Sequence, residues 1–296
     1  MMYKWATFIT LCVVQINGYV IVDPELGVDP ETLLPNVDTS GINGLSATGL
    51  YCNTGTRQSP IDIPYCVQKS LSALRIEGHS DIRPEGFTML NTGSTAQISY
   101  NGLPVPTLSG GPLPKDSTYE FVQAHFHWGN DNVEGTEHAI HDTYGALEIH
   151  FVHRKSTYSD LATAIQHSDG LAVFGIIFSE QATNNTRLDK IIPNLANIIT
   201  EGTTTTLDED AMVWLDEVIS AFQYYNYPGS LTTGDCNEVV NWIVMKRKIG
   251  ISAAQVAKFR NLIGKDGYPI EEYRRHIQNL NNRVIKCARK DTSRFH

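Results

Sequence analysis

Runs in which apolar and polar residues alternate recur along the chain from about residue 51 onward, separated by turn signals such as Asn101-Gly102 and Asp169-Gly170. An alternation with a period of two is typical of strands that bury one face. Helical patterns are fewer and shorter. The predicted strands span 97–100, 119–128, 146–153, 171–178 and 239–246, and the predicted helices span 161–166, 187–192 with a continuation past Pro193 to 199, and 253–262, which Ser252 caps.

These elements show no internal repeat, and no shift in composition divides the chain after residue 51. We therefore expect one domain that is mainly β, with a mixed or antiparallel sheet and peripheral helices.

The N-terminus has the pattern of an export signal, in which the single cation Lys4 precedes an apolar stretch over 5–14. This stretch is too short for a helix that crosses a bilayer of about 30 Å, and it predicts a signal peptide over residues 1–18. Residues 19–50 are rich in Gly, Thr, Asn, Asp and Pro and predict an extended arm. The C-terminal residues lack the hydrophobic tail of a GPI signal. We expect a secreted, extracellular protein with neither a transmembrane segment nor a GPI anchor.

Cysteine usage agrees with export. After the predicted signal peptide the chain has four cysteines, which predict two disulfides, and the sequence alone leaves three pairings open. The sequon Asn184-Asn185-Thr186 follows an apolar strand and predicts an N-glycan on Asn184.

Charge excludes one class of partner. The 296 residues carry a formal net charge of −9, and the longest basic run is Lys246-Arg247-Lys248. Nucleic-acid binding depends on cations that neutralise phosphates, so the charge balance argues against a nucleic-acid partner.

Ten histidines invite a search for a metal site. In the predicted strand 119–128, Gln123, His125 and His127 share one face, because side chains alternate along a strand. Glu148 and His150 share a face of the strand 146–153 in the same way. If the two strands lie side by side, three imidazoles converge, and Gln123 and Glu148 can accept their spare ring N–H groups.

Three neutral imidazoles that leave a fourth position open for water are typical ligands of a catalytic zinc. A lone His-x-His is more often a pair of ordinary histidines, but the matched Glu-x-His on a second strand argues against that interpretation. The sequence therefore predicts a Zn²⁺ site. The remaining histidines lack this pattern: His153 faces the other way, and we expect the others in polar, exposed segments, namely His79, His141, His167, His276 and His296.

Short motifs follow one another along the chain in a characteristic order. They are Gln58-Ser59-Pro60-Ile61-Asp62-Ile63, Ser109-Gly110-Gly111-Pro112-Leu113, Gln123 to Gly129, Glu137-His138, Glu148 to His153, Gly170 to Val173, Tyr227 to Thr233, and Trp242. By these motifs the chain resembles the alpha-class carbonic anhydrases from about residue 52 to about residue 284. The resemblance implies that family's fold, a single domain over residues 51–296 on a large central twisted sheet that is mixed and mostly antiparallel. It also implies the reversible hydration of carbon dioxide to bicarbonate and a proton by zinc-bound hydroxide.

By this resemblance each matching residue has a role. The zinc ligands are His125, His127 and His150, with Gln123, Glu148 and His138 behind them. Thr232 accepts a hydrogen bond from the zinc-bound hydroxide and passes its own proton toward Glu137. The carbon dioxide pocket is lined by Val152, Val173, Leu231, Thr233, Val240 and Trp242.

The chain departs from the family at the position of the proton shuttle. Fast members carry a histidine after an Asn-x-Gly, whereas Ser94 follows Asn91-Thr92-Gly93 here. A serine hydroxyl does not titrate near pH 7, so we expect an active enzyme that is limited by proton transfer. Two further departures are Gly234-Asp235 in place of a Pro-Pro, and the absence of an N-terminal His-Trp-x-Tyr motif.

The resemblance also implies a disulfide between Cys52 and Cys236, which would brace the loop of Thr232. Cys66 and Cys287 are then left to each other.

A rival interpretation is a non-catalytic extracellular binding module on the same fold. The three histidines, Thr232 and Glu137 favour the enzyme, and an esterase activity of the same site would be a side reaction. The sequence leaves the oligomeric state open.

Overall fold

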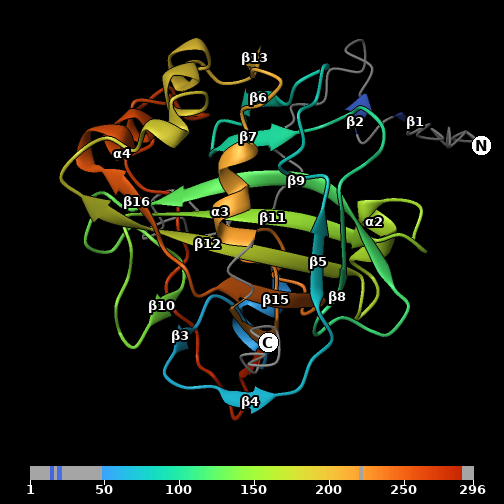
Figure 1. The fold of residues 1–296 in the computed structure, drawn as a ribbon. Coiled ribbons are helices and arrows are strands. Elements are labelled where there is room, and N and C mark those ends of the chain that lie inside the picture. Colours follow the sequence, from blue (N-terminus) through green and yellow to red (C-terminus); the bar gives the residue numbers. More distant parts are fainter. Residues whose placement is uncertain (1–13, 17–18, 22–48, 220–222, 289–296) are drawn as a thin grey trace, which may run out of the picture. The chain divides into compact units, whose positions relative to one another are not determined.

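The structure, a computed structural model, describes residues 14–16, 19–21, 49–219 and 223–288 (Figure 1). The chain divides into two compact units, residues 1–41 and 42–296. In the first unit, β1 (Val14–Ile16) pairs antiparallel with β2 (Tyr19–Ile21). The predicted signal peptide and extended arm lie mostly outside the described residues, so both remain predictions.

The second unit is built around a 13-stranded sheet, which confirms the predicted fold class. Its main path runs β13-β6-β7-β9-β11-β12-β15-β14-β17-β4, with β8 beside β9, β5 beside β8 and β16 beside β12. A separate two-stranded sheet joins β3 (Asp62–Ile63) to β10 (Ala139–Ile140). The strands of the main sheet are β4 (Val67–Lys69), β5 (Leu74–Glu77), β6 (Thr88–Asn91), β7 (Ala96–Ser99), β8 (Thr107–Gly110), β9 (Thr118–Trp128), β11 (Leu147–Lys155), β12 (Leu171–Gln181), β13 (Thr204–Thr206), β14 (Tyr224–Gly229), β15 (Val240–Met245), β16 (Ile249–Ser252) and β17 (Lys286–Ala288).

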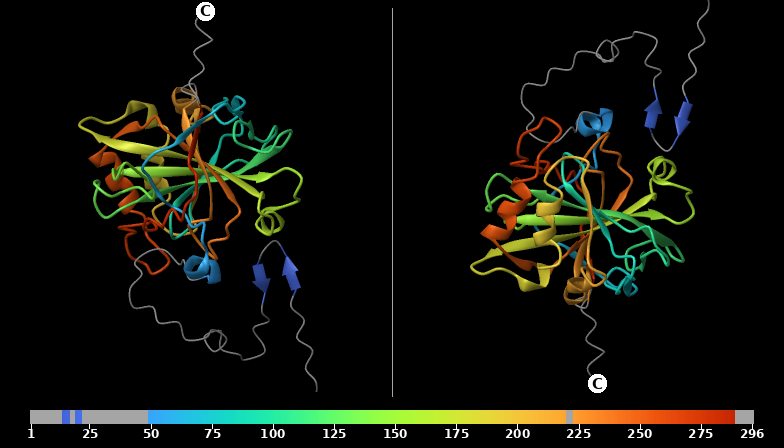
Figure 2. Two further views of the ribbon diagram at one scale, coloured as in Figure 1. Left: turned by 90° about the horizontal axis from the view of Figure 1, so that it is seen from below. Right: turned by 90° about the horizontal axis from the view of Figure 1, so that it is seen from above.

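The main sheet is mixed and mostly antiparallel. Its parallel pairs are β12 with β15, β12 with β16, and β17 with β4. The long strands β9, β11 and β12 lie side by side through its centre (Figures 1 and 2). Each position of β11 from 147 to 154 therefore has a neighbour on both sides, which fixes the side chains that this strand presents to each face.

Each face of the sheet supports its own apolar core. Along β11, Ile149 and Phe151 belong to one core together with Trp128, whereas Val152 belongs to the other together with Trp242. The strand alternation predicts this division, because successive side chains point to opposite faces. Residues with the parity of His150 therefore face the core of Val152.

The helices are short and peripheral, as predicted. Ser252 caps α4 through a capping box with Gln255, close to the predicted 253–262. The helix predicted over 187–192 and on to 199 is not continuous: two short 3₁₀ helices cover part of this range, and Pro193, which lacks an N–H, stands at the start of the second. The helices are α1 (Leu50–Thr54), α2 (Leu161–Ala164), η3 (Thr186–Leu188), η4 (Ile192–Asn197), η5 (Val213–Leu215), α3 (Asp216–Ile219) and α4 (Ala253–Arg260). Within the described ranges, none of them is long and apolar enough to cross a membrane.

One prediction about the histidines is wrong. His79, expected in an exposed segment, is 2% exposed. Its ring lies among Phe121, Phe151 and Phe174, and its Nε2 is 2.7 Å from Nε2 of His153. The segment after β5 turns inward at Gly78, which has a φ of +80°, and this turn has no periodic signature in the sequence.

Two disulfides join distant parts of the chain. Cys52 is bonded to Cys236, and Cys66 to Cys287, which are the pairings that the family resemblance implies. The second bond lies beside the pairing of β17 with β4.

Candidate metal centre

The register of two central strands brings three histidines together. β9 and β11 pair so that His150 lies directly opposite His125, and Glu148 lies opposite His127. The ring centroids of the three histidines are 4.5–5.4 Å apart. Each ring offers a nitrogen within 4.8 Å of the other two.

Hydrogen bonds behind the rings fix which nitrogen faces inward. Nδ1 of His125 donates to Oε1 of Gln123 at 2.9 Å, and Nε2 of His150 donates to Oε1 of Glu148 at 2.8 Å. Nδ1 of His127 donates to the main-chain carbonyl of Tyr273 at 3.1 Å. Each neutral ring then keeps one lone pair, on Nε2 of His125 and His127 and on Nδ1 of His150.

The inward nitrogens fit a zinc ion. Nε2 of His127 is buried and has no hydrogen-bond partner among the described residues, an unusual state for a buried polar atom. Three neutral imidazole nitrogens on a rigid sheet, with acceptors behind them, are the donor set of a three-histidine zinc site. His125, His127 and His150 are therefore the residues that would hold the metal.

Electrostatics keep the rings neutral. Burial lowers the pKa of His127 well below its usual value and that of His125 to about 3, and the neighbouring His150 adds to both shifts. Burial also lowers the pKa of His150, although Glu148 opposes the shift. For Glu148, burial alone would raise the pKa, but His138 and His150 outweigh it and hold the pKa well below the usual range. Glu148 is thus charged, while the His150 ring that donates a hydrogen bond to it is neutral.

A hydrogen-bonded chain extends outward from Glu148. Its Oε1 accepts from Nδ1 of His138 at 2.7 Å, and Nε2 of His138 lies 2.6 Å from the Tyr227 hydroxyl. That hydroxyl lies 2.9 Å from Oγ of Ser59. His138 and Glu148 are fully buried, so these hydrogen bonds restrain the carboxylate of Glu148, and through it the ring of His150.

Glu137 lies beside the ligands. Its Oε1 is 3.3 Å from Nδ1 of His127 and accepts the main-chain N–H of Arg275 at 2.8 Å. Burial raises the pKa of Glu137 to about 8, and the charge of Glu148 adds to this, while the N–H of Arg275 and the Thr232 side chain oppose it. Thr232, far from Glu137 in the sequence, thus lies near enough to this carboxyl group to lower its pKa.

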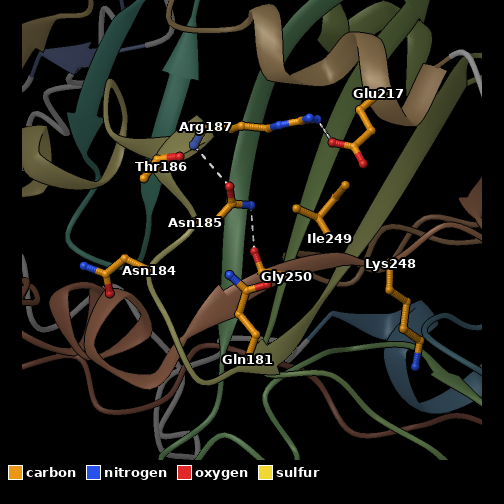
Figure 3. A pocket seen from close by; sticks show the side chains of 9 residues that line it. All are labelled: Gln181, Asn184, Asn185, Thr186, Arg187, Glu217, Lys248, Ile249 and Gly250. Carbon is orange, nitrogen blue, oxygen red and sulfur yellow. Dashed lines mark hydrogen bonds and ion pairs between the residues drawn. The ribbon is translucent and has the colours of Figure 1, made fainter.

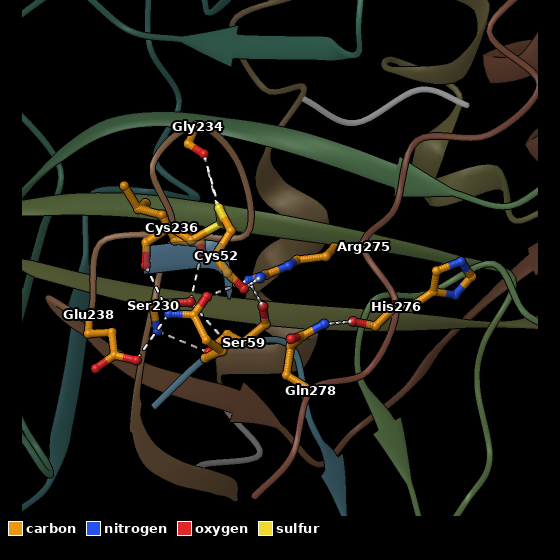
Figure 4. Close-up of a disulfide and its surroundings, with 11 residues drawn as sticks. Cys52, Ser59, Ser230, Gly234, Cys236, Glu238, Arg275, His276 and Gln278 are labelled. Carbon is orange, nitrogen blue, oxygen red and sulfur yellow. Dashed lines mark hydrogen bonds between the residues drawn. A yellow bond between two sulfur atoms is a disulfide. The ribbon is translucent and has the colours of Figure 1, made fainter. Parts of the chain in front are cut away.

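The loop that carries Thr232 is fastened on several sides (Figure 4). The disulfide joins its Cys236 to Cys52, and the Gln58 amide donates to the carbonyl of Cys236 at 3.1 Å. At its start, Oγ of Ser230 accepts the main-chain N–H of Ser59 at 2.9 Å. Gly234 has a φ of +60°, and a Cβ there would meet nothing within 4 Å, so the departure at Gly234-Asp235 lies on an open turn.

The residues expected to line the substrate pocket gather in one place. Val152 lies opposite Val173, and Val173 lies opposite Trp242, across three adjacent strands. The Trp242 ring is 4.7 Å from that of His150. Val240 belongs to the same apolar core, Leu231 packs against it, and Thr233 is partly exposed on the loop beyond.

Comparison with known proteins decides the family. The eukaryotic-type carbonic anhydrase family matches residues 46–289. The chain belongs to this family. It is 36% identical to carbonic anhydrase 6 of Bos taurus over 241 residues, which are 79% of this chain and 73% of that protein. It is 29% identical to carbonic anhydrase 15 of Mus musculus over 246 residues, which are 79% of this chain and 76% of that protein.

Ser94 lies in the turn between β6 and β7 and is partly exposed. β7 pairs with β9, and Gln97, three residues after Ser94, lies opposite His125. Ser94 lines a surface pocket of about 380 Å³ together with Asn130 and the acidic residues Asp266, Glu271 and Glu272. The turn is thus close in the sheet to a metal-facing histidine.

The sequence analysis missed two contributors to the centre. The Tyr273 ring stacks on His127 at 5.0 Å with an interplanar angle of 8°, in addition to its carbonyl contact. The Arg275 side chain donates to Oε1 of Gln58 and to the carbonyl of Ser59 at 2.9 and 2.7 Å. Both residues lie on a segment outside the helices and named strands, where no periodic pattern indicates which side chains or carbonyls face the centre.

Proposed function

We propose that this protein catalyses the reversible hydration of carbon dioxide to bicarbonate and a proton, with zinc as its cofactor. The observation that carries the proposal is the convergence of three inward ring nitrogens, whose other nitrogens are all engaged. Family membership supports the same reaction.

His125, His127 and His150 hold the metal, and zinc bound there supplies a Lewis acid that makes water nucleophilic near neutral pH. Gln123, Glu148 and the carbonyl of Tyr273 keep the rings oriented. Thr232 accepts a hydrogen bond from the nucleophile and directs its own proton toward Glu137. This pair restricts the nucleophile to one orientation, which lowers the entropic part of the barrier.

The apolar residues beside the histidines hold the substrate. Carbon dioxide carries no net charge or hydrogen-bond donor, so a wall made of Val152, Val173, Leu231, Val240 and Trp242 suits it. Thr233 lies on the loop at the edge of this wall.

Truncation of Thr232 to alanine removes an oriented polar contact, and we expect kcat/KM to fall by about 10²-fold.

The proton leaves slowly in this proposal, because Ser94 stands where a titratable shuttle would act. The test is stopped-flow hydration of carbon dioxide by the zinc-loaded protein, before and after chelation, over a series of imidazole concentrations. Zinc-dependent turnover that rises with imidazole supports both parts. Zinc-dependent turnover that does not change with imidazole concentration would contradict the proposed limitation by proton transfer. Absence of turnover with zinc bound would contradict the proposed enzyme activity and favour a binding module.

Ser94→His sharpens this test. A titratable group at this turn should raise the saturated turnover at low buffer by about tenfold or more. Ser168→His is the matched control, because Ser168 is exposed in the turn between α2 and β12. An equal gain from both variants would show that any surface histidine suffices and that position 94 has no special place.

We also propose that the protein is secreted, with residues 1–18 as signal peptide, 19–50 as an arm and 51–296 as the enzyme domain. Two disulfides support an oxidising compartment. Expression of the full chain in cultured animal cells tests this: recovery from the medium, with an N-terminus near residue 19, is the expected result.

A further inference from the structure

The segment that links β12 to η3 lies on the surface and carries the one N-glycosylation sequon of the sequence, Asn184-Asn185-Thr186. Asn184 and Thr186 are exposed, and Asn185 is partly buried. The tripeptide borders a pocket of about 300 Å³ with polar side chains around it (Figure 3). Polar, accessible surroundings are what an attached sugar requires.

The two asparagines of the sequon are bonded differently. Nδ2 of Asn185 donates to the carbonyl of Gly250 at 2.8 Å, and its Oδ1 accepts the N–H of Arg187 at 3.1 Å. Both polar atoms of Asn185 are therefore engaged. Asn184 uses only Oδ1, which accepts from Oγ of Ser252 at 2.6 Å. Its Nδ2 makes no hydrogen bond to any residue in the described ranges.

The surrounding contacts hold this arrangement in place. The main chain of Asn185 exchanges two hydrogen bonds with the Gln255 side chain, at 2.9 and 3.0 Å. Gln255 and Ser252 form the capping box of α4. The sequon is thus attached to the start of a helix, with the amide nitrogen of Asn184 directed away from the other residues of the pocket (Figure 3).

We infer that Asn184 is N-glycosylated, an inference that rests on the proposed export of the chain. The donor is a lipid-linked oligosaccharide diphosphate of the host's secretory pathway. The bond from sugar C1 to Nδ2 forms, the bond from C1 to the diphosphate oxygen breaks, the lipid diphosphate leaves, and the amide releases one proton. The product keeps Oδ1 as an acceptor, so the contact with Ser252 survives glycosylation.

The experiment uses the full chain, secreted from cultured animal cells and collected from the medium. Treatment with peptide N-glycosidase F should increase its electrophoretic mobility, and peptide mapping should show conversion of Asn184 to aspartate. Thr186→Ala and Asn184→Gln should each abolish the shift. Thr186→Ser retains the sequon and should retain the shift, as should Thr183→Ala, which changes an exposed neighbour outside the sequon.

The outcomes separate the glycan from the export on which it rests. Secreted protein with both disulfides formed but no mobility shift overturns the glycan and leaves the export intact. A shift that persists in both Thr186→Ala and Asn184→Gln places the sugar elsewhere and also overturns the assignment. Protein that stays in the cell with free thiols contradicts the export and the glycan together.

Discussion

Two groups of histidines, all buried except for the partly buried His125, lie on opposite faces of the central sheet, and β11 contributes to both. On one face, His125, His127 and His150 each direct one ring nitrogen to other protein groups and one inward. On the other face, His153 donates Nδ1 to the carbonyl of Phe151 at 3.0 Å, and its Nε2 accepts from His79. Within the described residues, that pair leaves a single unpartnered nitrogen, Nδ1 of His79.

Burial does not distinguish the two groups. Burial lowers the pKa of His153 to about 3 and that of His79 well below its usual value, much as it does for His125 and His127. The difference lies in where the lone pairs point. Three lone pairs that converge can hold a metal ion, whereas the rings of His79 and His153 are hydrogen-bonded to each other and pack among phenylalanines.

Zinc affinity should separate the two groups most strongly. His127→Ala removes a ligand, and we expect zinc affinity to fall by well over 100-fold. This loss exceeds the 10- to 100-fold loss that is typical when a residue hydrogen-bonded to a metal ligand is replaced. His153→Phe should leave zinc affinity unchanged. Competition with a chromophoric chelator measures both, and equal losses would mean that the two faces are not independent.

Glu148 tests whether the acceptors behind the rings matter. Glu148→Ala leaves the ring N–H groups of His138 and His150 without their acceptor, and zinc affinity should fall by about 10- to 100-fold. Glu180→Ala, on exposed β12 surface, is the matched control and should bind zinc like the wild type. The same chelator competition reports the result, and a wild-type affinity for Glu148→Ala would contradict the orienting role.

A double-mutant cycle tests the His79–His153 pair. Either His79→Phe or His153→Phe alone leaves a buried ring nitrogen unpaired, which should lower the free energy of unfolding by about 1–3 kcal/mol. The double variant places two phenylalanines in an aromatic setting and should recover most of this loss. Urea unfolding measures all four proteins, and strictly additive losses would show that the two rings do not interact.

The smallest expected effect is on the pH dependence of stability. Burial lowers both pKa values in the folded state, and for His79 the charges of His153 and Arg83 add to the shift. Below the unfolded pKa of about 6.5 the unfolded chain binds more protons, so the pair's stability is complete above that pH and declines as the pH falls. From pH 7.5 to 6 the wild type should lose about 1.5 kcal/mol more than the double variant. Parallel losses in the two proteins would contradict the assignment of neutral rings.

The sequence predicted the centre of this molecule better than its edges. The long central strands alternate apolar and polar residues with a period of two. That period alone placed Gln123, His125 and His127 on one face of the strand and Phe126 on the other. Strand β14 was missed, because Pro228 and Gly229 are residues that usually argue against a strand. His79 was misplaced because a turn, not a periodic element, carries it inward. The contacts of Tyr273 depend on a long-range fold of an irregular segment, which local patterns do not encode.

The two disulfides have a consequence for the integrity of the chain. We expect proteases to cut the turn after β11, residues 156–160, in which every residue except Tyr158 is exposed. A cut there yields one piece with Cys52, Cys66 and the three ligand histidines, and a second with Cys236, Cys287 and Thr232. Both disulfides cross that break, so the severed halves remain one covalent molecule. The cut therefore does not separate the two fragments until a reductant breaks both disulfides.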